Sequence, residues 1–267
     1  MTTSETLVTY EAADGIAVVT LSDPPANTYS YDMMRALDAA VLQARMDDAV
    51  HVIVVRGAGD KFFCAGANIK MLASVTPRFK YYFCLHANET LARLEQTPKL
   101  VIAALNGHCV GGGLEVALAA DFRFARKGAG RVGLPEVGLG VLPGTGGTQR
   151  LLRLVGKARA FELMATGRLF DFDEARALGI VTDVIDAPDA DAFLAEVRRR
   201  ALEYVPPARA SRTVGLIKRA VHSGGEMALG EGLALERELQ QQLFESEDAR
   251  EGLAANLEKR RPAFKGR

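Results

Sequence analysis

Residues 50–75 read VHVIVVRGAGDKFFCAGANIKMLASV and combine a strand, a turn and the start of a helix. The continuous apolar run VHVIVV predicts a strand that is buried on both faces. The segment IKMLASV, residues 69–75, begins an apolar pattern at helical spacing. Between the two, residues 64–67 are Cys, Ala, Gly and Ala. Such small side chains allow a ligand or another segment to approach the backbone closely.

The alternation of strands and helices continues on both sides of this stretch. The Pro24–Pro25 pair ends a first apolar strand, because proline cannot continue a ladder, and Ser30 or Asp32 is a candidate cap for the helix that follows. This order predicts an α/β domain with much parallel strand. The predicted strands cover residues 15–23, 51–59 and 99–105, and extended structure resumes at 122–125 and 131–136. The predicted helices cover residues 33–44, 79–94, 111–121, 147–156 and 157–167.

The pattern changes after about residue 190, where the remaining sequence predicts helices and no strand. We therefore divide the chain into a core domain, residues 1–195, that carries the active site and a C-terminal helical region, residues 196–267. One long helix of this region has an apolar face that either covers the core or meets a neighbouring subunit. Its members are Leu233, Leu235, Leu239, Leu243 and Phe244.

Composition and charge narrow the class of protein. The 267 residues are 48% hydrophobic and 25% charged, which is typical of a globular protein with a substantial core. The 33 basic and 33 acidic residues balance, so no net charge attracts nucleic acid or an anionic membrane. The N-terminus predicts neither a signal peptide nor a transit peptide. The three cysteines form no CxxC pair, which favours reduced thiols in a cytoplasmic protein.

Several motifs with possible chemistry are set aside. The glycine-rich segment GLGVLPGTGGTQR, residues 138–150, lacks the Lys-Ser/Thr ending of a phosphate loop, so a turn into a helix is favoured. The Cys and His residues do not have zinc-type spacing, and no metal site is expected. No GxSxG elbow is present, and Cys64 has no histidine within local reach.

Two glutamates remain as candidates for chemistry. In NGHCVGGGLE, residues 106–115, a buried strand ends at glycines that lead into a helix and leave amide groups uncovered near Glu115. In LPEVGLG, residues 134–140, apolar neighbours favour partial burial of Glu136. Each glutamate alone is also explained by a structural role, as a helix cap or a partner of the helix dipole.

Together with FCAGANIK, these segments resemble the crotonase superfamily and specifically its enoyl-CoA hydratases. The resemblance covers essentially the whole chain, from PPAN at residues 24–27 to EDAREGLAANLEKRRPAF at residues 247–264. It implies an α/β fold, a crotonase-like spiral of ββα units with a C-terminal helical trimerisation region. It also implies a homo-oligomer, either a trimer or a dimer of trimers.

The resemblance implies a role for each matching residue. The amides of Ala67 and Gly112 would form an oxyanion hole for the thioester carbonyl of an acyl-CoA substrate. Preorganised amides stabilise the negative charge that develops on such an oxygen. Lys259 matches a position near the CoA phosphates, reached across a subunit contact. The other positions expected to contact the substrate or its CoA group are Ala67, Asn68, Ile69, Lys70 and Gly112.

Glu115 and Glu136 match the two catalytic glutamates of the hydratases. The resemblance implies addition of water to a trans-2-enoyl-CoA, giving a 3-hydroxyacyl-CoA, in fatty-acid β-oxidation or related acyl-CoA catabolism. Glu136 would protonate C2 and Glu115 would position the water, with no cofactor besides the CoA of the substrate. Another crotonase reaction, such as double-bond isomerisation or C–C cleavage, remains an alternative. An acyl-CoA-binding protein without turnover is a third possibility.

Three residues depart from the usual pattern of the family. Asn68 replaces a common aspartate, Tyr29 occupies a position that is usually small and aliphatic, and Asn256 replaces an aromatic residue near the CoA adenine. These changes concern the pocket and the CoA contacts. The acyl chain length, a specialised aromatic or cyclic substrate, the stereochemistry and the choice between trimer and hexamer therefore stay open.

Overall fold

The main sheet has six strands in the order β1-β2-β3-β5-β7-β9. The computed structural model describes residues 6–267. Only β1 and β2 pair antiparallel, and every other neighbouring pair is parallel, as predicted. The strands are β1 (Val8–Ala13), β2 (Ile16–Leu21), β3 (Val52–Gly57), β5 (Leu100–Leu105), β7 (Phe122–Arg126) and β9 (Asp183–Ile185).

A second, three-stranded parallel sheet consists of β4 (Phe62–Cys64), β6 (His108–Val110) and β8 (Val132–Gly133). Each of its strands directly follows a strand of the main sheet and is followed by helix. The chain therefore repeats a strand–strand–helix unit, which confirms the predicted spiral. Because β4 and β6 are neighbours, the segments that leave their ends lie together.

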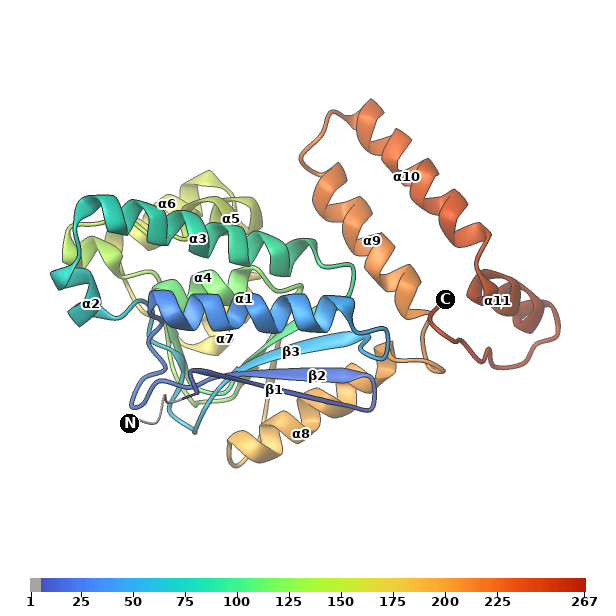
Figure 1. Ribbon diagram of the computed structural model, residues 1–267, viewed down its shortest axis with the longest axis horizontal. Helices are drawn as coiled ribbons and strands as arrows, with labels where there is room; N and C mark the ends of the chain where they lie inside the picture. Colours follow the sequence, from blue (N-terminus) through green and yellow to red (C-terminus); the bar gives the residue numbers. More distant parts are fainter. Residues whose placement is uncertain (1–5) are drawn as a thin grey trace.

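Helices cover both faces of the main sheet. Figure 1 shows α1, α3 and α4 on one face and α8 on the other. Successive residues of a strand point to opposite faces, so Val54 packs in the cluster with α8 and Val55 in the cluster with α1 and α3. The helices are α1 (Tyr31–Met46), α2 (Ile69–Ser74), α3 (Pro77–Gln96), α4 (Gly112–Leu118), α5 (Gly147–Val155), α6 (Lys157–Thr166), α7 (Phe172–Ala177), α8 (Ala190–Ala201), α9 (Ser211–Gly224), α10 (Leu229–Phe244) and α11 (Glu247–Leu257), with short 3-10 helices η1 (Glu136–Leu139) and η2 (Leu202–Tyr204).

The C-terminal helices extend away from the sheet (Figure 1). In α10, Leu239 is buried, whereas Leu233 and Phe244 of the predicted apolar face are exposed. The last residues pack against α11, where Asp248 accepts hydrogen bonds from the amides of Lys265 and Gly266. The division at residue 195 stays a prediction, and α8 spans this position. Within residues 6–267, no helix has the length and apolar character needed to cross a membrane.

Asn106 fixes the turn between the two sheets. Its buried side chain accepts a hydrogen bond from Gly57 N at 3.0 Å and donates one to Gly59 O at 2.7 Å. Gly57 ends β3, and Gly59 lies in the turn that leads from β3 to β4. The position of β4, and of the segment that follows it, therefore depends on this amide.

Asn106→Ala would leave the buried N–H of Gly57 without its acceptor and the carbonyl of Gly59 without its donor. We expect the free energy of unfolding to fall by about 2–3 kcal/mol, measured by urea denaturation. Asn256→Ala, which truncates an exposed side chain of α11, is the control and should change stability by less than about 0.5 kcal/mol. Equal effects of the two substitutions would contradict this account of the turn.

Candidate active site

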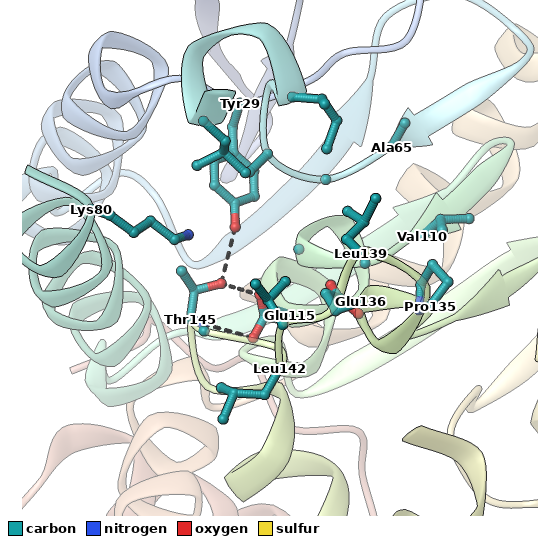
Figure 2. Close-up of a pocket in the computed structure, with 18 residues that line it drawn as sticks. Tyr29, Ala65, Lys80, Val110, Glu115, Pro135, Glu136, Leu139, Leu142 and Thr145 are labelled. Atoms are coloured by element: carbon teal, nitrogen blue, oxygen red, sulfur yellow. Dashed lines mark hydrogen bonds between the residues drawn. The ribbon is translucent and has the colours of Figure 1, made fainter. Parts of the chain in front are cut away.

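The pocket lies where the segments after β4 and β6 meet the turn before α5. Its wall is formed by residues from four segments and by Tyr29 and Lys80. Figure 2 shows Glu115, Glu136 and Thr145 facing this space, with the Lys80 side chain reaching in from α3. The four segments contribute Ala65, Gly66, Ala67, Ile69 and Leu72; Val110, Gly111, Gly112 and Glu115; Pro135 and Glu136; and Leu139, Val141, Leu142, Gly144 and Thr145.

The Ala67 amide is directed away from its backbone neighbours. Tyr29 N donates to Gly66 O and Asn68 N donates to Tyr29 O, both at 2.9 Å. Gly66 and Asn68 thus make the two hydrogen bonds of a parallel bridge between Tyr29 and Ala67. The N–H of Ala67 therefore points to the other side, and Ala67 lines the pocket.

The Gly112 amide is the second uncovered donor. Gly112 is the first residue of α4, so its N–H has no acceptor within that helix. A Cβ placed on Gly66 would lie 3.0 Å from Gly112 N, which shows how closely the two segments approach. Among residues 6–267, neither the Ala67 N–H nor the Gly112 N–H donates a hydrogen bond. The two amides are free to bind one ligand oxygen.

Two glycines at the start of α4 are required by their surroundings. Gly111 has a φ of +57°, and a Cβ there would lie 2.8 Å from Glu136 Oε1. A Cβ on Gly112 would lie 2.2 Å from the hydroxyl oxygen of Tyr29. A larger residue at either position would therefore displace a side chain of the pocket.

Glu115 is buried and accepts three hydrogen bonds. Its Oε1 accepts from Thr145 N at 2.8 Å and from Gly147 N at 2.7 Å, while its Oε2 accepts from the Thr145 hydroxyl. Gly147 is the first residue of α5, so the carboxylate also lies at the positive end of that helix. Donors of this kind stabilise the ionised carboxylate.

Glu136 has a different environment. Its Oε2 is buried and, in the part of the chain that the structure describes, has no hydrogen-bond partner. Burial raises the pKa of Glu136 from 4.5 to about 7, and the charge of Glu115 acts in the same direction, against smaller opposing effects that include the ammonium of Lys80. One pocket thus holds a carboxylate with several donors and a carboxyl group whose pKa is raised to near neutrality.

Comparison with known proteins agrees with this geometry. A family model described as enoyl-CoA hydratase/isomerase matches residues 11–267. The chain belongs to the enoyl-CoA hydratase/isomerase family. This confirms the resemblance to the crotonase superfamily that the motifs indicated.

The similarity to relatives and to solved structures extends over nearly the whole chain. The sequence is 36% identical to a short-chain-enoyl-CoA hydratase of Clostridium acetobutylicum, covering 97% of this chain and 98% of the relative. It is 34% identical to a crotonyl-CoA hydratase of Syntrophomonas wolfei, covering 95% and 96%. An enoyl-CoA hydratase structure from Geobacillus kaustophilus superposes with a TM-score of 0.93 at 44% identity, covering 99% of this chain and 98% of that one.

The pocket brings together five of the residues predicted for this family's site. Ala67, Ile69, Gly112, Glu115 and Glu136 all line it. The predicted roles of these residues remain proposals, because no substrate is bound.

Three other predicted residues do not line the pocket. Asn68 caps α2, where its side chain accepts a hydrogen bond from Met71 N at 3.0 Å. Lys70 is exposed on the same helix. Lys259 is exposed just after α11, with a φ of +55°. Their predicted contacts with CoA stay predictions.

Sequence reasoning missed three contributors to the site. Thr145 and Gly147, which hold Glu115, belong to the glycine-rich segment that was interpreted only as a turn. Lys80, the one cation that lines the pocket among the residues described, gave no signal in its helical pattern. The turn interpretation itself was sound, since α5 begins at Gly147.

Cys64 is structural in the folded chain. Its thiol is fully buried, and burial raises its pKa to about 12, so it remains protonated at neutral pH. A protonated, inaccessible thiol is a poor nucleophile. Within residues 6–267, no group of His, Cys, Asp or Glu is arranged to hold a metal ion.

The raised pKa of Glu136 predicts a dependence of stability on pH. Between about pH 4.5 and 7 the folded chain binds more protons at this carboxyl than the unfolded chain does, so the stability of the wild type falls as the pH rises. Glu136→Gln lacks this effect. We expect its free energy of unfolding, relative to wild type, to increase by about 1–2 kcal/mol between pH 4.5 and 8, allowing for partial exposure of the carboxyl.

Urea denaturation at several pH values measures this difference. Glu89→Gln, an exposed position on α3, is the matched control and should show no such trend. A constant difference between wild type and Glu136→Gln would show that Glu136 titrates as an ordinary carboxyl.

Proposed function

We propose that this protein is an enoyl-CoA hydratase, a hydro-lyase that adds water to a trans-2-enoyl-CoA to give a 3-hydroxyacyl-CoA. The observation that carries the proposal is the pair of glutamates in one pocket, beside the uncovered amides of Ala67 and Gly112. Relatives named as enoyl-CoA and crotonyl-CoA hydratases are similar in sequence over most of the chain. Fatty-acid β-oxidation, or related acyl-CoA breakdown, is the process in which such a reaction serves.

The two amides would act as an oxyanion hole. When water attacks C3 of an enoyl thioester, electrons move through the double bond and negative charge develops on the thioester oxygen. Each preorganised amide aimed at that oxygen stabilises the transition state by about 3 kcal/mol. The absence of a side chain at Gly112 and the small side chain of Ala67 leave the approach open.

The two glutamates would divide the proton transfers. Glu115, oriented by its three donors, accepts a proton from the water as the oxygen bonds to C3. Glu136, whose pKa is raised by burial to about 7, donates its proton to C2 from its protonated form. The step leaves Glu115 protonated and Glu136 ionised, so one proton must return before the next turnover. The pair therefore titrates as a coupled unit during the reaction.

The CoA group is part of the substrate and provides the contacts by which the enzyme binds it. The reaction requires no further cofactor. We assign its contacts to Asn68, Ile69 and Lys70 after β4 and, across a subunit contact, to Lys259. The three cysteines are free thiols, which supports a reducing, cytoplasmic location.

A homo-oligomer, a trimer or a dimer of trimers, is the proposed assembly. The C-terminal helices extend from the body (Figure 1) and expose large apolar side chains that a single chain does not cover. Such a surface favours contact with further copies of the chain. The exposed side chains of these helices are Ile217, Val221, Leu229, Leu233, Phe244, Leu253 and Leu257.

Hydration of crotonyl-CoA tests the reaction directly. We expect the wild type to consume the enoyl absorbance and to incorporate ¹⁸O from labelled water at C3. Glu115→Gln and Glu136→Gln should each lower kcat by about 10³-fold or more, because each removes one proton-transfer group. Wild-type turnover without ¹⁸O incorporation would indicate isomerisation instead. Full activity of either variant would reject the assigned chemistry.

Lys259→Ala tests the proposed CoA contact. An ion pair with a CoA phosphate forms equally in the ground state and the transition state, so its loss should raise KM about 3–10-fold and leave kcat within about twofold. High salt should reduce the difference between variant and wild type. Lys127→Ala, at an exposed position on the turn after β7, is the control. An unchanged KM would remove Lys259 from the site.

A further inference from the structure

Hydrogen bonds connect the Tyr29 hydroxyl to the Glu115 carboxylate through the Thr145 hydroxyl. The Tyr29 hydroxyl lies 3.0 Å from Thr145 Oγ1, and Thr145 Oγ1 is hydrogen bonded to Glu115 Oε2. Tyr29, Thr145 and Glu115 are 2%, 1% and 2% exposed, so bulk water does not compete for these contacts. Figure 2 shows these hydrogen bonds as dashed lines between residues that line the pocket.

The direction of each hydrogen bond follows from the chemistry of the groups. An ionised carboxylate only accepts, so the single hydroxyl proton of Thr145 is donated to Glu115. Thr145 Oγ1 then has only lone pairs for Tyr29, and Tyr29 must be the donor. Burial raises the pKa of Tyr29 well above 10, so the phenol keeps the proton that this role requires.

The backbone of Tyr29 belongs to the same site. It forms the bridge with Ala67 that directs the Ala67 amide into the pocket. Its ring packs against Phe83 with 5.8 Å between ring centroids, and its hydroxyl occupies the space left by the absent side chain of Gly112. One residue therefore contacts both proposed oxyanion-hole segments and, through Thr145, the proposed base.

We propose that Tyr29 is a positioning residue for the reaction, which orients Thr145 so that Thr145 holds the carboxylate of Glu115 aligned toward the substrate. This inference rests on the proposed hydratase function. It assigns a role to Tyr29, which occupies a position where the family usually has an aliphatic residue. Because Tyr29 acts through Thr145, its hydroxyl should matter only while the Thr145 hydroxyl is present.

A double-mutant cycle tests this dependence. Tyr29→Phe and Thr145→Val each remove a hydroxyl at nearly constant volume. On crotonyl-CoA, we expect kcat to fall about 3–10-fold in Tyr29→Phe and about 30–100-fold in Thr145→Val, with KM changed less than about twofold. The double variant should match Thr145→Val within about twofold, because the two losses are not independent.

Two further variants control for structural effects. Tyr10→Phe removes a buried hydroxyl in β1 that has no hydrogen-bond partner among the described residues, and it should leave kcat unchanged. Thr145→Ser keeps the hydroxyl and should retain most of the activity. If Tyr29→Phe keeps the wild-type kcat, or if the losses of Tyr29→Phe and Thr145→Val multiply, the proposal is overturned.

A second readout is independent of turnover. Infrared spectroscopy of protein labelled with ¹³C-glutamate, with the Glu115 band assigned by Glu115→Gln, follows the hydrogen bonding of this carboxylate. We expect the frequency of its antisymmetric stretch to shift in Tyr29→Phe and to shift further in Thr145→Val, because both substitutions weaken hydrogen-bond donation to the carboxylate. An unmoved band in Tyr29→Phe contradicts the proposal. If the band shifts in the variants but the wild type hydrates no enoyl-CoA, the proposed function alone is refuted.

Discussion

The buried carboxylate of Glu115 is the group around which the pocket is arranged. Removal of an ion from water costs several kcal/mol unless hydrogen bonds replace the lost solvent. Here Thr145 N, Gly147 N and the Thr145 hydroxyl replace it. These donors come from a turn far along the chain from α4, so the interaction fixes the turn before α5 against the first turn of α4. Without the carboxylate, the amides of that turn would themselves lack acceptors.

The same interaction makes the two glutamates unequal. Glu115 has donors on both oxygens, whereas Glu136 lies against apolar residues and the backbone of Gly111 with a buried oxygen that no donor of the described chain reaches. Beside burial, the proximity of Glu115 disfavours a charge on Glu136. Two residues of one type thus acquire different surroundings, as an acid and a base in a water addition require.

Much of this arrangement could be predicted from the sequence because it depends on local patterns. The apolar run at residues 52–55 predicted a buried strand, and Ser30 was a predicted cap that does accept a hydrogen bond from Met33 N. The small residues after β4 and the glycines before Glu115 marked the backbone segments that line the pocket. The contact between Tyr29 and Thr145 joins residues 116 positions apart, and no local periodicity records such a pairing. The short strand β9 was also missed, because three residues are too few to show a clear alternation of apolar and polar side chains.

The tyrosine at position 29 also changes how Gly112 should be understood. In a site with a small side chain at position 29, a glycine at 112 serves mainly to uncover an amide. In this chain, the Tyr29 hydroxyl already occupies the space of a Cβ at position 112, so glycine is required even before a substrate binds. The Gly112 amide, Tyr29 and Glu115 are therefore coupled, by steric contact between the first two and by hydrogen bonds through Thr145 between the last two. A substitution at any one of them would alter the surroundings of the others, whereas the side chain of Asn68 caps α2 outside the pocket.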